Sequence, residues 1–259
     1  MKAVRCVWVC IMAVLAGCSE PEPIRLGLIA GLSGKHADLG TECRNGVQLA
    51  VEEQNARGGI QGSALILLAR DDHSSAAEAS KQVAQLDEQE RVMALLGPAL
   101  SGVAVGILED INRRRLVTMG LTTTSNQLSD KDDFYFRIIS PTRQHASVSA
   151  RYMRQRAQVF DYVAIYDVTN RAYTESWLND FSRTFVQSGG HEVARLAYDG
   201  DRDKVRELVT RANAHGADLV VLVTGATDAA LMIKEIRAAR PDQTVMTSEW
   251  AATPTFVGL

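Results

Sequence analysis

The residues best placed to do chemistry lie near the start of the chain, where residues 15–18 read Leu-Ala-Gly-Cys. A basic head and the apolar run Cys6–Ala16 precede the tetrad, and this order is that of a bacterial lipobox. Signal peptidase needs small residues before the cut, and the Cys18 thiol is the nucleophile that accepts diacylglycerol. We therefore expect residues 1–17 to be a lipoprotein signal peptide and Cys18 to be lipidated.

Two other interpretations of this segment are open. A plain secretory signal could carry a cysteine by chance. A buried helix would not explain basic residues at one end and small residues before a cysteine at the other. The apolar run is too short for a stable membrane span. With residues 18–23 as a short polar tether, two or three acyl chains would hold the protein durably on a membrane, facing the periplasm in a Gram-negative cell.

Other reactive residues give no pattern of catalysis. Ser33, in the Gly-Leu-Ser-Gly turn at 31–34, lacks the spacing of a nucleophile elbow. No other nucleophile–base pair, metal set or phosphate loop is apparent, so we expect no enzyme, no metal and no cofactor. Cys43 is alone once the signal is removed and Cys18 is lipidated, which excludes an intrachain disulfide and predicts a small buried apolar residue.

Composition limits the class of protein and its partners. Without the signal, about 240 residues remain, enough for one large or two small α/β domains. Hydrophobic residues make up 46% and charged residues 23%, which is ordinary for a globular protein with a real core. The net charge is −3, and no basic surface argues for nucleic acid as a partner.

The hydrophobic pattern alternates between strands and helices, and restarts after Pro141. This order predicts α/β architecture with two doubly wound, Rossmann-like lobes and mainly parallel sheets, at 24–140 and 141–259. We expect a hinge at residues 140–142, where the chain first crosses between the lobes. The predicted strands are 24–30, 65–69, 92–96, 116–119, 134–138, 162–166, 191–198, 218–223 and 244–247, and the predicted helices are 42–56, 75–89, 101–112, 144–155, 174–188, 203–215 and 227–239.

Ligands of such sheets bind beyond the carboxyl ends of the strands. In this chain those ends carry glycines, hydroxyl residues and a few acids. Asp71 and Asp72 at one end are expected to be structural, because adjacent aspartates commonly hold a loop by local hydrogen bonds. The remaining ends lie at 30–34, 97–101, 120–125, 167–173, 225 and 248–250.

Motifs at these ends resemble the type I periplasmic substrate-binding proteins, in particular the Leu/Ile/Val-binding-protein-like branch. The resemblance covers essentially residues 24–250. Its first stretch is specific, because its glycines, its helix and the end of that helix at Asn55, Gly58 and Gly59 recur in the same order as in the family. The stretches include IRLGLIAGLSGKHADLGTECRNGVQLAVEEQNARGGIQG, MALLGPALSGVAV, LVTMGLTTTSNQLS and VMTSEWA. The family traps a small polar ligand, commonly an amino acid, between two lobes and delivers it to an ABC importer.

The resemblance implies a set of ligand-binding residues. Ser101 matches the serine that binds the ligand carboxylate, and the loop 122–124 matches backbone and hydroxyl groups that bind carboxylate and ammonium. Tyr173 matches a tyrosine that closes over the ligand from the second lobe. Glu249 matches the acid that pairs with the α-ammonium, and Leu39 a position lining the side-chain pocket. The whole set is Leu39, Ser101, Thr122, Thr123, Thr124, Tyr173 and Glu249.

Elementary electrostatics supports the same arrangement. The N-terminus of a helix offers unpaired N–H groups and partial positive charge to a carboxylate, and one acid opposite supplies the charge that an ammonium needs. Each residue also has a purely structural interpretation. Ser101 could cap its helix, the threonines could form a solvated turn, Tyr173 could pack in a loop longer than the branch's usual form, and Glu249 could be an exposed acid.

The resemblance therefore predicts a solute receptor for a small amino acid or related carboxylate, without catalysis, that delivers it to an ABC importer permease. A ligand-sensing module that signals to a membrane partner is the alternative, and an enzyme is a third class. Members of the family run considerably further than Leu259, so we expect the second lobe to be incomplete and the chain to be a fragment or the product of a truncated gene.

Overall fold

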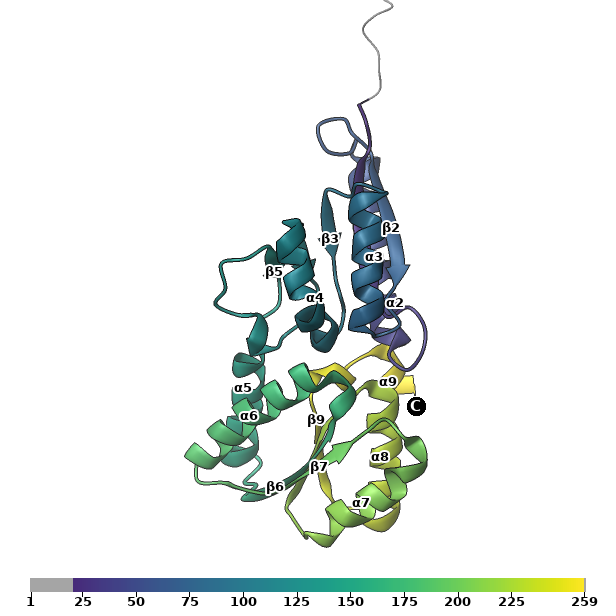
Figure 1. Ribbon diagram of the computed structural model, residues 1–259. Coiled ribbons are helices and arrows are strands. Elements are labelled where there is room, and N and C mark those ends of the chain that lie inside the picture. Colours follow the sequence, from purple (N-terminus) through teal and green to yellow (C-terminus); the bar gives the residue numbers. More distant parts are fainter. Residues whose placement is uncertain (1–20, 259) are drawn as a thin grey trace, which may run out of the picture.

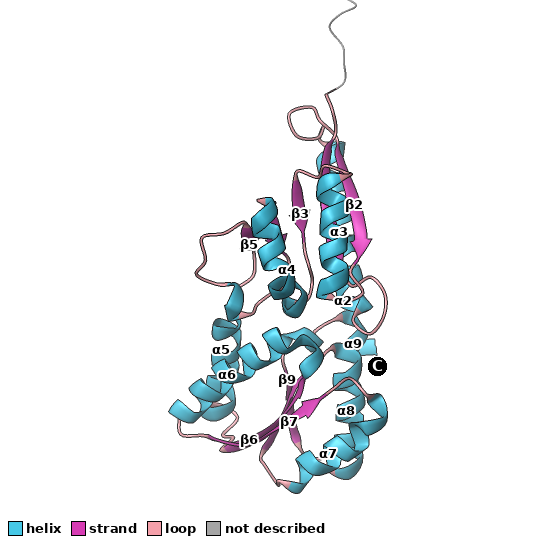
Figure 2. Ribbon diagram, viewed as in Figure 1, coloured by secondary structure: helices cyan, strands magenta, loops and turns pink. Residues whose placement is uncertain are grey.

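A computed structural model describes residues 21–258, which form two parallel sheets with helices packed around them (Figures 1 and 2). In Figure 1 the sheet formed by the first half of the chain lies above the sheet formed by the second half. The predicted signal peptide and Cys18 lie outside the described residues. Within 21–258, no helix is both long enough and apolar enough to be a membrane span.

The first sheet has the strand order β2-β1-β3-β4-β5, and all its pairs are parallel. The end of β1 is buried on both faces, so its run of apolar residues needs no polar alternation. Its strands are β1 (Ile24–Ala30), β2 (Leu65–Asp71), β3 (Ala94–Leu96), β4 (Thr118–Gly120) and β5 (Tyr135–Arg137).

The second sheet has the order β7-β6-β8-β9 and is also parallel throughout. The fold class predicted from the sequence is confirmed, since strands and helices alternate in two parallel α/β sheets; the lobe boundary at residue 140 stays a prediction. The strands are β6 (Asp161–Asp167), β7 (His191–Tyr198), β8 (Leu219–Val223) and β9 (Thr244–Thr247).

α-Helices connect most successive strands, whereas β4 and β5 are joined by a loop that holds only a 3-10 turn; short 3-10 turns also occupy other loops. The α-helices are α2 (Ala37–Ala56), α3 (Ala76–Glu88), α4 (Ser101–Arg114), α5 (Thr142–Gln155), α6 (Arg171–Gln187), α7 (Val205–Ala214), α8 (Ala226–Ala239) and α9 (Pro254–Gly258). The 3-10 turns are η1 (Asn126–Leu128), η2 (Val168–Asn170), η3 (Arg202–Lys204) and η4 (Glu249–Ala251).

An aromatic series on α6 anchors the core near the junction of the two sheets. Tyr173, Trp177, Phe181 and Phe185 recur every fourth residue, so they share one buried helical face. The rings of Trp177 and Phe181 stack at 5.1 Å between centroids, and those of Phe181 and Phe185 at 5.5 Å. The series fixes the rotation of α6 and brings Tyr173 to the carboxyl ends of the strands.

Two helix starts differ from the sequence prediction and affect the site. The helix α2 begins at Ala37 rather than at residue 42, so Leu39 lies in its first turn. The helix α6 begins at Arg171 rather than 174, and Tyr173 is therefore a helical residue instead of a loop residue. The turn η4 and the helix α9 follow β9 and were not predicted.

Candidate functional site

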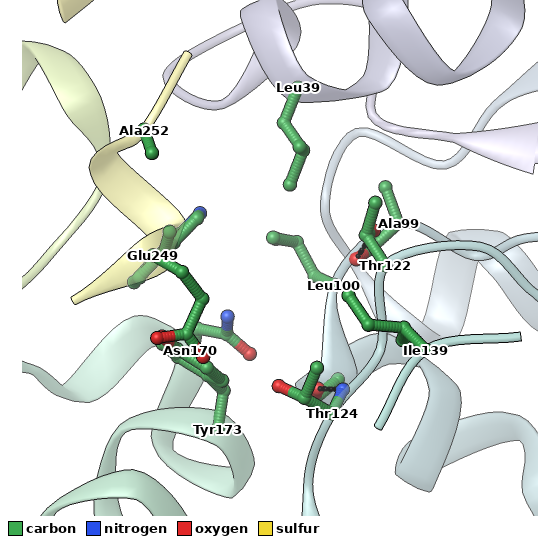
Figure 3. Close-up of a pocket in the computed structure, with 12 residues that line it drawn as sticks. Leu39, Ala99, Leu100, Thr122, Thr124, Ile139, Asn170, Tyr173, Glu249 and Ala252 are labelled. Carbon is green, nitrogen blue, oxygen red and sulfur yellow. Dashed lines mark hydrogen bonds between the residues drawn. The ribbon is translucent and has the colours of Figure 1, made fainter. Parts of the chain in front are cut away.

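A cavity of about 230 Å³ lies between the two sheets, at the carboxyl ends of their strands. Figure 3 shows Asn170, Tyr173 and Glu249 on one side of an open space, and Thr124 and other residues of the first half on the other. All the predicted site residues except Thr123 line it. The lining residues are Leu39, Ala99, Leu100, Ser101, Thr122, Thr124, Ile139, Asn170, Tyr173, Glu249, Trp250 and Ala252.

Ser101 is the first residue of α4, and it does not cap that helix. Leu100 occupies the N-cap position without a side-chain cap, while the Ser101 hydroxyl oxygen accepts hydrogen bonds from the backbone N–H of Thr124 at 3.1 Å and of Ser125 at 3.3 Å. The Ser101 hydroxyl therefore holds the 122–125 loop against the start of α4. Its own hydrogen remains available to donate, as do first-turn N–H groups that have no partner within the helix.

The three threonines have different roles. The Thr122 hydroxyl donates to the Ala99 carbonyl at 2.7 Å, which ties this loop to the turn before α4. The Thr123 hydroxyl lies 2.6 Å from the Tyr135 hydroxyl in the buried interior, so this side chain does not reach the cavity. The Thr124 hydroxyl is buried and has no hydrogen-bond partner among residues 21–258. Thr124 is thus the threonine whose hydroxyl is free to contact a ligand.

Glu249 and Tyr173 supply the polar groups of the opposite wall. The Trp177 indole N–H donates to Glu249 Oε2 at 2.8 Å, and Glu249 Oε1 has no partner in the described part of the chain. The Tyr173 hydroxyl is also buried and makes no hydrogen bond there, although Ser248 and the Glu249 carboxylate lie beside it. Burial first, and then the Glu249 carboxylate beside it, hold the pKa of Tyr173 well above its ordinary value. The phenol therefore stays protonated and able to donate.

Two polar or aromatic lining residues were not predicted from the sequence. Asn170 Oδ1 accepts the Gly102 backbone N–H at 2.9 Å, so a residue of the second half contacts the first turn of α4. Trp250 packs edge-on against Tyr173, with ring centroids 5.6 Å apart, and against His36 at 5.0 Å. Asn170 follows a strand end and Trp250 adjoins Glu249, and these positions were the available sequence signals.

The remaining wall is apolar. Leu39 lies between the two groups of polar side chains in Figure 3, and the first half also contributes Leu100 and Ile139. Ala252 adds a small side chain from the segment after η4. Because these residues offer no hydrogen-bonding side chains, this part of the cavity suits an apolar portion of a ligand. The polar groups described above would fix its orientation.

One group of side chains, Ser33, His73 and Asp71, has the residue types of a serine triad, but its geometry does not favour catalysis. His73 Nδ1 lies 2.9 Å from the Ser33 hydroxyl and 3.2 Å from Asp71 Oδ2. In a serine triad the two partners use different ring nitrogens, whereas here both contact the same one. Among residues 21–258, no group of three or more His, Cys, Asp or Glu side chains is arranged to hold a metal ion.

The expected structural role of the two aspartates is confirmed. Asp71 Oδ1 accepts the N–H groups of Leu32 at 2.9 Å and His73 at 2.8 Å, and Asp72 Oδ1 accepts that of Ser74 at 2.7 Å. Cys43 is a free thiol that packs against the apolar cluster around Leu28 and Ala30, and it is half-buried, not fully buried as expected.

Comparisons with known proteins agree with this architecture. A curated Leu/Ile/Val-binding protein from Rhizobium johnstonii is 26% identical over 237 residues, covering 90% of this chain and 63% of that protein. A leucine binding protein structure from Thermotoga maritima superposes with a TM-score of 0.82 at 18% identity, over 91% of this chain and 66% of that one. The structure of a Rhodopseudomonas palustris solute binding protein in complex with benzoate superposes with a TM-score of 0.78 at 19% identity. The match covers 88% of this chain and 63% of that one.

These relatives confirm the resemblance to the Leu/Ile/Val-binding-protein-like branch, and the chain spans about three fifths of their length. A family model described as periplasmic binding protein matches residues 23–256, which include both sheets and every residue that lines the cavity. The chain therefore belongs to the periplasmic binding protein family.

Proposed function

We propose that this protein captures a small amino acid or related carboxylate in the cavity between its sheets and delivers it to an ABC importer, without catalysis. The start of α4, with Ser101 and the Thr124 hydroxyl, would bind the ligand carboxylate. Glu249 would pair with an α-ammonium, and Tyr173 would donate from the same wall. The apolar wall around Leu39 would receive the side chain.

The observation that carries the proposal is the set of buried polar atoms left without partners at this cavity. Thr124 Oγ1, the Tyr173 hydroxyl and Glu249 Oε1 each lack a hydrogen bond among residues 21–258. Buried polar groups in native proteins are nearly always paired, and a group left unpaired typically costs about 1–3 kcal/mol. The carboxylate of a ligand would accept hydrogen bonds from the hydroxyl groups, and its ammonium would donate to Glu249 Oε1.

A thermal-shift panel of amino acids, small carboxylates and amides tests the proposal first. A ligand present at a hundredfold its dissociation constant stabilises the folded protein by about 2.7 kcal/mol, which gives a clear shift. Relatives include proteins named for leucine, isoleucine and valine, and one crystallised with benzoate, so both classes belong in the panel. A panel without any shift would contradict a receptor of this class.

Two substitutions then test how the ligand is held. Glu249→Gln removes the charge that meets the ammonium, and breaking a buried charge pair costs about 2–5 kcal/mol. Ser101→Ala removes one donor to a charged group and should cost less, about 1.5–3 kcal/mol. Calorimetry on an amino-acid ligand should therefore rank Glu249→Gln as the more damaging change.

Glu175→Gln is the matched control, because this carboxylate on α6 pairs with Arg171 and does not line the cavity. It should leave affinity unchanged. If Glu249→Gln also leaves affinity unchanged while Ser101→Ala abolishes binding, the ligand carries no ammonium at that place. A simple carboxylate or an amide would then replace the amino acid.

The proposed location is the extracytoplasmic face of a membrane, with a lipid on Cys18 as anchor. Membership of a periplasmic family supports an extracytoplasmic site, and the Leu-Ala-Gly-Cys tetrad supports the lipid. Cys18→Ala should abolish both membrane association and the incorporation of labelled fatty acid. Equal labelling of wild type and variant would rule out lipidation of Cys18.

The partner is proposed to be an importer permease, and uptake measurements decide between transport and sensing. Deleting the gene should reduce uptake of the ligand identified by the panel. Normal uptake together with loss of a ligand-dependent signal would favour the sensory alternative.

A further inference from the structure

The indole N–H of Trp177 makes a polar contact that packing alone does not require. Trp177 is fully buried on α6, and its ring stacks on Phe181 with an interplanar angle of 13°. Its nitrogen is 2.8 Å from Glu249 Oε2, although 72 residues separate the two along the chain. An indole nitrogen is a donor only, so in this contact Glu249 is necessarily the acceptor.

The contact divides the Glu249 carboxylate between the protein and the cavity. Oε2 accepts from the indole, whereas Oε1 has no partner within residues 21–258. A carboxylate bonded through one oxygen to a rigid donor cannot turn freely about its terminal torsion. The oxygen left over is therefore held in one place, as binding-site groups are when neighbouring side chains support them.

The aromatic series on α6 makes the donor itself rigid. Trp177 follows the cavity residue Tyr173 by one helical turn, and Phe181 and Phe185 continue the stack behind it. Tyr162 from β6 packs edge-on against both phenylalanines, at 5.0 and 5.1 Å between centroids. The indole is thus fully buried and stacked within this cluster, and core packing holds the direction of its N–H.

We propose that Trp177 is a positioning residue: its N–H orients Glu249 so that Oε1 receives the ammonium of the ligand, and this contact sets the preference for amino acids over their deaminated acids. The inference rests on the proposed function, because it concerns the same carboxylate. A ligand without an ammonium would leave Oε1 unpaired. The more firmly Oε1 is held in place, the more strongly the site should discriminate amino acids from their deaminated acids.

The test compares Trp177→Phe with wild type on two probes, L-leucine and 4-methylpentanoate, which share a side chain and differ in the ammonium. If the panel selects another amino acid, that amino acid and its deaminated acid replace them. Phenylalanine keeps an aromatic ring against Phe181 but has no N–H. The ratio of the dissociation constant of 4-methylpentanoate to that of L-leucine should fall at least about tenfold, the lower end of what removing the supporting partner of a ligating group costs at metal sites.

Tyr162→Phe is the matched control, because it deletes one polar group from the same aromatic cluster, away from the cavity. It should change stability and leave the ratio unchanged. In the Glu249→Gln background, adding Trp177→Phe should alter the ratio by less than it does in wild type, because the charge that the indole orients is gone.

The outcomes separate this inference from the proposed function. If wild type prefers the amino acid and Trp177→Phe keeps the full preference, or weakens both probes equally, Trp177 is only a packing residue and the inference is wrong. If wild type shows no preference, or binds neither member of any pair, the role of Glu249 in the proposed function fails, and the inference fails with it.

Discussion

Among residues 21–258, some buried polar side chains bond within the fold, and others keep an atom without a hydrogen-bond partner, at the cavity and elsewhere. Asp71 accepts backbone N–H groups of Leu32 in the loop after β1 and of His73 in its own loop, Asp72 accepts that of Ser74, and the Thr123 hydroxyl pairs with Tyr135. By contrast, the hydroxyls of Thr124 and Tyr173 are buried beside the cavity with no hydrogen-bond partner in the chain from residue 21 to residue 258. Sequence motifs identify both kinds as polar residues at strand ends, and only tertiary contacts separate them.

Asp72 gives a prediction about pH at this scale. It is 1% exposed, and burial raises its pKa from 3.8 to about 6, against the opposing effect of the Ser74 N–H. The folded protein therefore binds this proton more tightly than the unfolded chain. The stabilisation is full below pH 3.8 and is lost as the pH rises through about 6. At about 1.4 kcal/mol per pKa unit, the change approaches 3 kcal/mol.

Asp72→Asn keeps an acceptor for the Ser74 N–H and removes the titration. Denaturant unfolding at pH 5 and pH 8 should show wild type losing more stability than the variant between the two values. Asp203→Asn is the matched control, because Asp203 is exposed and its replacement alters no buried charge. Parallel loss of stability in wild type and Asp72→Asn would show that the Asp72 pKa is not raised.

At the scale of elements, the periodic parts of the fold could be predicted and the starts of two helices could not. The buried strands β6 and β8 are apolar runs bounded by turn residues, and both follow the predicted pattern. The start of α6 was missed although Asn170, a residue type favoured at N-caps, occupies its N-cap position. The Asn170 side chain accepts from Gly102 on α4 instead of capping its own helix, and neighbouring residues do not indicate that contact.

The site was predicted through motifs at strand ends, and its supporting contacts were not. Ser101, Thr124 and Glu249 meet at one cavity because the carboxyl ends of parallel strands come together. The bond between Trp177 and Glu249 depends on how α6 packs across the second sheet, which no local pattern encodes. Residues that support a site therefore needed coordinates, whereas residues expected to touch the ligand did not.

At the scale of the whole molecule, charged and polar contacts join the two halves around the cavity. Lys35, in the loop between β1 and α2, reaches two aspartates of the second half; its Nζ lies 2.7 Å from Asp167 Oδ2 and 2.7 Å from Asp228 Oδ2. Asp38 near the start of α2 accepts the Thr253 hydroxyl at 3.0 Å. Any hinge motion that opens the cavity must break such contacts, and any closure restores them.

Lys35→Met should therefore weaken ligand binding without touching the ligand. Asp167 is 0% exposed and Asp228 is 1% exposed. Without the Lys35 ammonium, Asp228 would keep its pair with Arg202, whereas Asp167 would be buried on closure without the cation that pairs with it here. Lys35 itself is 25% exposed, and we expect a loss at the lower end of the range for broken buried pairs, about 2 kcal/mol, mainly as faster dissociation.

Lys204→Met is the control, because Lys204 pairs with Asp199 and Asp201 of its own loop. Stopped-flow dissociation of the ligand found by the panel measures the effect, and small-angle scattering reports whether the ligand-free variant is more open. A lower melting temperature with an unchanged dissociation rate would mean that Lys35 stabilises the fold and not the closed state.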